Sequence, residues 1–130
     1  MACQNGHKQT VDVLLKNGAN VNLTKTVDPL TSPLEVAAGK GHTEIVEKLR
    51  SAGAVINYQN KDGATPLYVA CQNGHKQTVD VLLKNGANVN LTTTVDPLSS
   101  PLGIAAEKGH TEIVEKLISA GAVINYQNKV

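Results

Sequence analysis

Residues 62–90 read D-G-A-T-P-L-Y-V-A-C-Q-N-G-H-K-Q-T-V-D-V-L-L-K-N-G-A-N-V-N, and the order of signals in this stretch decides the fold. Asp62-Gly63 is a turn signal, because glycine supplies the backbone freedom that a tight turn needs. Thr65 predicts a helix N-cap, and Pro66 suits the first helical position, where its missing N–H costs nothing. Gly74 suits the left-handed residue that commonly ends a helix. The sequence therefore predicts a short helix between Pro66 and Gly74.

A second helix is predicted directly after the first. Val79, Leu82 and Leu83 follow the i, i+3, i+4 spacing of one helical face, which places a helix over about 76–85. Gly86 is expected to end it. Both segments are shorter than the roughly 12 to 15 residues at which an isolated helix becomes marginally stable. Each helix pair must therefore be stabilised by burying its apolar face against neighbouring pairs.

The same signals recur along the whole chain. Residues 2–61 repeat as residues 70–129 at an offset of 68, and six of these 60 aligned positions differ. Each half divides again, since S-P-L or T-P-L recurs at 32, 65 and 100, and Gly-His recurs at 6, 41, 74 and 109. A fixed period of this length is typical of stacked repeats. We predict a single all-α domain, a solenoid of helix-turn-helix units, with repeats at about 1–26 (truncated), 27–61, 62–94 and 95–130.

The composition allows a packed domain and excludes several functions. The chain has 130 residues, of which 41% are hydrophobic and 18% charged, with a net charge of +1. The core must be aliphatic, because Trp and Phe are absent and there are three Tyr. The near-neutral charge argues against nucleic-acid binding, and no apolar run is long enough to span a membrane. No secretory signal precedes the first repeat, which favours an intracellular protein.

Residues that could carry chemistry are scattered at the repeat period. His7, His42, His75 and His110 are expected to lie one layer apart, too far for one zinc ion. Cys3 and Cys71 are two layers apart, too far for a disulfide, and are interpreted as buried thiols. No nucleophile elbow or phosphate-binding loop is present. We therefore expect no enzymatic activity, no metal site and no cofactor.

The ordered set T-P-L, G-H, an aliphatic stripe and G-A-x-V-N, repeated at 33 to 35 residues, resembles the ankyrin repeat. The resemblance implies a non-catalytic scaffold that binds a protein partner through a concave face of turns ("fingers") and first helices. It also implies that each His of the Gly-His pair fixes the turn between its two helices by hydrogen bonding. Glu35, Tyr68 and Gly103 depart from the family, since they stand where it usually has the His of T-P-L-H.

The partner-binding residues that the resemblance implies lie in the fingers and first helices. The fingers of the second and fourth units are two residues longer and contain Pro29 and Pro97, which should stiffen them. Tyr68 is the only aromatic residue in the set, and tyrosine is a favoured interface anchor. The predicted contacts are Lys25, Val27, Asp28, Leu30, Glu35, Lys61, Asp62, Tyr68, Gln72, Asn73, Val95, Asp96, Leu98 and Glu107.

Differences between the two copies gather on the same face. Five of the six fall in a long finger or a first helix, and the sixth replaces Arg50 by Ile118 in a second helix. The copies could present different contacts to a partner, or these positions could simply vary freely. The set of differences is Lys25/Thr93, Thr31/Ser99, Glu35/Gly103, Val36/Ile104, Gly39/Glu107 and Arg50/Ile118.

An alternative function also fits the near-identity of the copies. The chain could be a fragment of a structural or engineered repeat array that self-associates by end-to-end stacking and has no partner of its own. Such head-to-tail contacts are heterologous and can extend into a filament. A dependence of molecular mass on concentration would distinguish this array from a scaffold that binds another protein.

Overall fold

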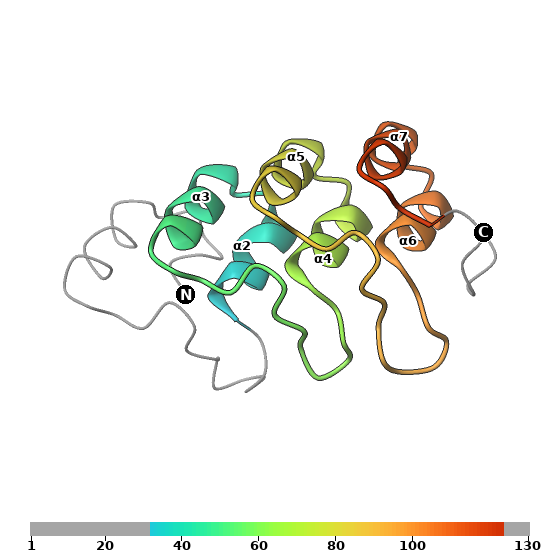
Figure 1. Cartoon of the computed structure of the whole chain (residues 1–130), viewed down its shortest axis with the longest axis horizontal. Helices are drawn as coiled ribbons and strands as arrows, with labels where there is room; N and C mark the ends of the chain where they lie inside the picture. The colour runs from blue at the N-terminus through green and yellow to red at the C-terminus, as the bar shows by residue number, and fades with distance from the viewer. Residues whose placement is uncertain (1–31, 124–130) are drawn as a thin grey trace.

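The computed structural model describes residues 32–123, and within this range the chain forms six helices and no strands. The helices form three pairs that stack side by side in chain order, as Figure 1 shows. We call these pairs the α2/α3, α4/α5 and α6/α7 layers. Their bounds are α2 Pro33–Lys40, α3 Thr43–Ser51, α4 Pro66–Asn73, α5 Lys76–Lys84, α6 Pro101–Glu107 and α7 Thr111–Ser119.

Each first helix begins with the predicted cap. The Thr65 hydroxyl accepts a hydrogen bond from the Tyr68 N–H at 3.1 Å, and Ser32 and Ser100 act in the same way in their layers. A proline follows each cap as the first helical residue. The prediction for α4 is confirmed, because the helix begins at Pro66 and Gly74 ends it.

The turns between paired helices depend on glycine. Gly41 and Gly74 end α2 and α4 in the left-handed conformation, with φ of 75° and 78°. Gly109 adopts the same φ of 78° two residues after α6. Glycine reaches this region without the steric cost that a side chain brings. The chain therefore reverses within about two residues and lays the second helix along the first.

The second helices bury one apolar stripe each. In α5, Val79 and Leu82 have no exposed surface, while Leu83 is only partly buried. The helix ends at Lys84 with Asn85 as its cap, one residue before the predicted end. The stripe packs against the first helices and the neighbouring second helices to form one continuous core. This confirms the predicted all-α solenoid.

The core is aliphatic, with two exceptions. Cys71 is fully buried, and burial raises the pKa of its thiol to about 12. The interpretation of Cys71 as a buried thiol is thus confirmed, whereas Cys3 lies outside the described residues. Tyr68 is the second exception, with 9% of its surface exposed.

The described part of the chain has neither a membrane-spanning helix nor a cluster of metal ligands. None of its helices is both long and apolar enough to cross a bilayer. Between residues 32 and 123, no three His, Cys, Asp or Glu side chains lie close enough to hold a metal ion.

Candidate protein-binding face

The short finger, residues 60–64, connects the α2/α3 and α4/α5 layers. The Asn60 side-chain oxygen accepts hydrogen bonds from the N–H groups of Asp62 and Ala64, at 2.9 and 3.0 Å. The backbone of Asn60 also pairs with that of Ala64, at 2.9 Å. These bonds close a tight turn in which Lys61 and Asp62 are exposed. The finger therefore presents one cation and one anion at its tip.

The long finger, residues 93–99, connects the α4/α5 and α6/α7 layers. The Thr93 N–H donates to the Ser99 carbonyl at 2.8 Å, and the Ser99 N–H donates to the Thr93 hydroxyl at 2.9 Å. This clamp leaves the intervening residues projecting from the layers. Val95 and Leu98 are 45% and 43% exposed, with Asp96 exposed between them. The tip of the long finger thus presents two apolar side chains with one carboxylate between them.

The two described fingers are bonded to each other. The Thr94 N–H donates to the Asp62 carbonyl at 2.8 Å. Gly63 makes this contact possible, because a Cβ at that position would stand 2.4 Å from the Thr94 nitrogen. The tips are consequently held as one surface.

Fewer side chains of the first helices are available to contact a partner than the sequence predicted. Gln72 and Glu107 are exposed, as expected for residues that face a partner. Asn73 donates its amide to the Gly39 carbonyl at 2.8 Å, and Glu35 is half-buried and accepts from the Asn60 amide at 2.8 Å. Asn73 and Glu35 therefore connect neighbouring layers, which limits their freedom to contact a partner.

The prediction that Tyr68 anchors a partner requires correction. Its side chain belongs to the core, where 9% exposure leaves too little surface for an interface anchor. The equivalent residue of the next layer is Gly103, which offers no side-chain bulk at this place. Four other predicted contacts, Lys25, Val27, Asp28 and Leu30, lie outside the described residues.

His75 and His110 act between layers, and the sequence did not reveal this. His75 Nε2 lies 3.0 Å from the Gly39 carbonyl oxygen, and His110 Nε2 lies 3.3 Å from that of Gln72. Both acceptors are in the preceding layer. The prediction that each ring fixes its own inter-helix turn is therefore wrong for these two residues. The turn between α4 and α5 is fixed instead by the backbone N–H of His75, which donates to the Ala70 carbonyl at 3.0 Å.

A second set of layer contacts uses the last asparagine of G-A-x-V-N. Asn57 accepts from the Asn88 N–H at 2.8 Å and donates to the Gly86 carbonyl at 3.3 Å. Asn90 repeats this pattern with Val123 and Gly121, at 2.9 and 3.4 Å. The recurrence of this asparagine was the sequence signal that could have identified its role.

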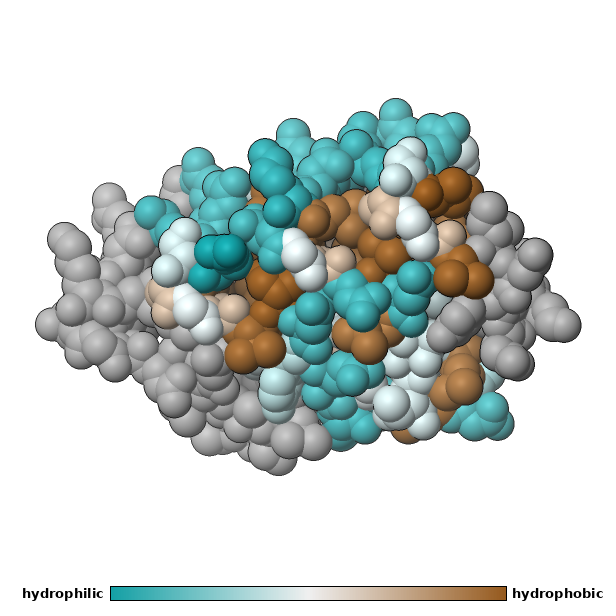
Figure 2. Space-filling model, viewed as in Figure 1, coloured by the Kyte–Doolittle hydropathy of each residue, from teal (hydrophilic) through white to brown (hydrophobic). Residues whose placement is uncertain are grey.

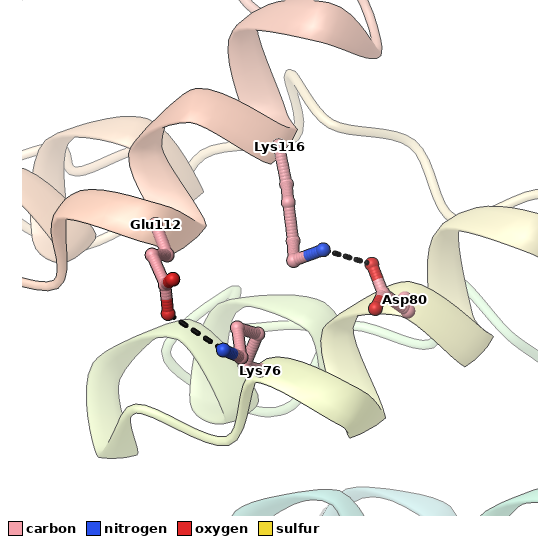
Figure 3. Close-up of polar contacts among 4 residues, drawn as sticks. All are labelled: Lys76, Asp80, Glu112 and Lys116. Atoms are coloured by element: carbon pink, nitrogen blue, oxygen red, sulfur yellow. Dashed lines mark hydrogen bonds and ion pairs between the residues drawn. The ribbon is translucent and has the colours of Figure 1, made fainter.

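Ion pairs join the second helices α5 and α7. Lys76 contacts Glu112 at 2.6 Å and Lys116 contacts Asp80 at 2.9 Å (Figure 3). The four side chains line a groove of about 520 Å³. The hydrogen bond to Glu112, together with its charge, raises the pKa of Lys76. The same bond and charge lower the pKa of Glu112. These four side chains pair with one another, and the exposed carboxylate of Glu115 lines the same groove.

The comparison with known families agrees with this geometry. A family model for ankyrin repeats, built on three copies, matches residues 1–93 and residues 34–128. The chain belongs to the ankyrin-repeat family. Ankyrin repeats are generally protein-interaction modules and are typically not enzymes. No curated protein matches the chain.

Proposed function

We propose that this ankyrin-repeat protein is a non-catalytic scaffold that binds another protein through its fingers and first helices. The observation that supports this most is the exposure of Val95 and Leu98 at the tip of the long finger. Exposed apolar side chains with a charged residue between them suit an interface, whose buried centre is apolar and whose rim is polar.

The proposed surface is smaller than the predicted residue set. It comprises the two finger tips and the exposed ends of the first helices, because Tyr68 is buried and Asn73 and Glu35 connect layers. Its described members are Lys61, Asp62, Gln72, Val95, Asp96, Leu98 and Glu107.

A selection experiment tests the proposal. Peptides selected from a random library for binding to the chain are titrated against Val95→Ser and Leu98→Ser, and we expect each variant to weaken binding at least about tenfold. Val55→Ser is the matched control, because Val55 is 49% exposed but lies in the connection that follows α3. Equal losses from the control and the finger variants would contradict the proposal, as would selected peptides that are insensitive to both finger variants.

The second candidate function is self-association by end-to-end stacking. It uses a different surface, the side of the α6/α7 layer that faces away from α4/α5. The exposure of Ala106 favours it, because the equivalent residues Ala38 and Cys71 of the other two layers are fully buried. Sedimentation over a range of protein concentrations tests this function by itself.

A further inference from the structure

The outer side of the α6/α7 layer has the composition of a buried surface. Ala106 is exposed, whereas Ala38 and Cys71, at the same place in the preceding layers, are fully buried. Val114 is likewise only partly buried, although its equivalents Val46 and Val79 have no exposed surface. Figure 2 shows hydrophobic surface at the α7 end of the molecule. This side therefore resembles a layer interface that lacks its second half.

Gly109 lacks the covering histidine ring that the equivalent glycines of the other two layers have. A Cβ on Gly41 would stand 2.6 Å from Nδ1 of His75, and one on Gly74 would stand 2.8 Å from Cε1 of His110. Each of these glycines is therefore covered by the histidine of the next layer. Gly109 has the same backbone conformation as Gly74, yet nothing lies within 4 Å of the corresponding position. The α6/α7 layer thus has an open position for one imidazole ring.

Thr111 shows a second open position. Between the α2/α3 and α4/α5 layers, the hydroxyls of Thr43 and Thr78 are hydrogen-bonded at 2.9 Å. Thr111 is the equivalent of Thr43, and the sequences of α3 and α7 differ only at Arg50/Ile118. Thr111 is exposed, whereas Thr43 is half-buried. The hydroxyl of Thr111 is therefore placed to receive a threonine like Thr78.

We infer that this outer side binds one more repeat with the sequence of α4/α5, and that residues 2–22 of a second copy supply it. Residues 2–22 are identical to residues 70–90, which form most of the α4/α5 layer. His7 of the second copy, the equivalent of His75, covers Gly109 and bonds the Glu107 carbonyl. Thr10 of the second copy, the equivalent of Thr78, bonds Thr111. This contact continues the interface that α2/α3 already makes with α4/α5.

Two of the differences between the copies shape this junction. Ile118 is 43% exposed where α3 has Arg50, so the outer side of α7 gains apolar area for association. Glu107 replaces Gly39, where a Cβ would stand 2.8 Å from Val69. Residue 1, at the place of Val69, is methionine, an unbranched side chain that adapts to such a gap. The junction is heterologous, because the two copies use different surfaces, and it can therefore extend to further copies.

The inference deepens the second function proposed above, and substitutions at the two open positions test it. In sedimentation equilibrium we expect the average mass of the full chain to rise above 13.7 kDa with concentration. His7→Ala and Thr111→Lys should each weaken this association at least about tenfold, since one loses the covering ring and the other places an unpaired charge in the junction. Ser51→Lys is the matched control, because it makes the same exchange of a hydroxyl for a lysine at an exposed place in α3. Thermal unfolding of each variant confirms that it folds.

The possible outcomes separate the inference from the function on which it rests. A constant monomer mass at every concentration would overturn both. Association that persists in His7→Ala and Thr111→Lys would overturn the inferred junction while leaving self-association in place. Equal weakening by Ser51→Lys would also overturn the junction, because the effect would then come from net charge. Loss in both junction variants with an unaffected control supports the inferred contact.

Discussion

The imidazole of His110 lies against Gly74 of the preceding layer, with Cε1 2.8 Å from the place where a Cβ would stand. The same ring is hydrogen-bonded through Nε2 to Gln72, at 3.3 Å. His75 repeats both contacts on Gly41 and Gly39. In this part of the chain, the Gly-His pair is therefore a contact between layers, in which the glycine of one layer admits the histidine of the next.

Gly74→Ala should destabilise the fold more than Gly109→Ala. Both glycines have φ of 78°, so a side chain at either place costs about 1–2 kcal/mol of backbone strain. Only at Gly74 would the new methyl also displace a histidine ring. We expect an additional loss of about 1–3 kcal/mol in the free energy of unfolding, measured by chemical denaturation. Equal losses at the two glycines would show that the ring moves aside without cost.

Replacing Glu112 tests the ion pair between α5 and α7. Its bond to Lys76 lowers the pKa of Glu112 from its ordinary value of 4.5, and raises that of Lys76 from its ordinary value of 10.5. The stabilisation by Glu112 is therefore present above pH 4.5 and is lost as the pH falls through its lower native pKa. That by Lys76 is present below pH 10.5 and is lost as the pH rises through its higher native pKa. Glu112→Gln should thus lower the unfolding temperature slightly at neutral pH and have no effect in strong acid.

Salt and a neighbouring residue provide the controls for this ion pair. The side chains of Lys76 and Glu112 are 47% and 70% exposed, so 0.5 M salt should remove most of the effect of Glu112→Gln. Glu115→Gln removes an equally charged, exposed side chain from the same helix and should change the unfolding temperature less. A larger effect from Glu115→Gln would show that the pair with Lys76 contributes nothing specific.

The sequence predicted local structure better than contacts between layers. The cap at Thr65 and the helix end at Gly74 were predictable because each depends on a residue and its immediate neighbours. The burial of Tyr68 was not predictable, because it depends on packing among layers and not on the residue itself. For His75, the repeat period gave one ring in each layer, but nothing local indicated that its partner lies 36 residues earlier. The exposed tip around Val95 and Leu98 was partly predictable, because the length and turn residues of this segment indicated a projecting finger.

Asn57→Ala should weaken the contact between the loops of adjacent layers. The change removes an acceptor for the Asn88 N–H and a donor to the Gly86 carbonyl, and should cost about 1–2 kcal/mol of unfolding free energy. Hydrogen exchange should show faster exchange of the Asn88 amide. Asn57→Asp keeps the acceptor, so it should protect that amide better than Asn57→Ala does. Unchanged protection in the alanine variant would contradict the assigned role.

Cys71 should be almost unreactive in the native protein. The chain has two cysteines, so Cys3→Ala leaves Cys71 as the only thiol. Burial raises the pKa of Cys71 from 9.0 to about 12, which lowers its thiolate fraction about a thousandfold near neutral pH. Reaction with a thiol reagent should therefore be slower than in denaturant by at least that factor. Native reaction within tenfold of the unfolded rate would contradict this burial.

The same burial predicts a loss of stability in alkali that depends on Cys71. Above pH 9 the unfolded chain ionises this thiol while the native protein retains the proton, because the native pKa is about 12. The unfolded state then binds fewer protons, so the free energy of unfolding falls as the pH rises from 9 towards 12. Cys71→Ala should flatten this decline and still fold, since Ala38 occupies the equivalent buried place in the α2/α3 layer. Denaturation curves at pH 8 and pH 10.5 measure the difference, and equal declines in the two proteins would show that the thiol ionises without opening the core.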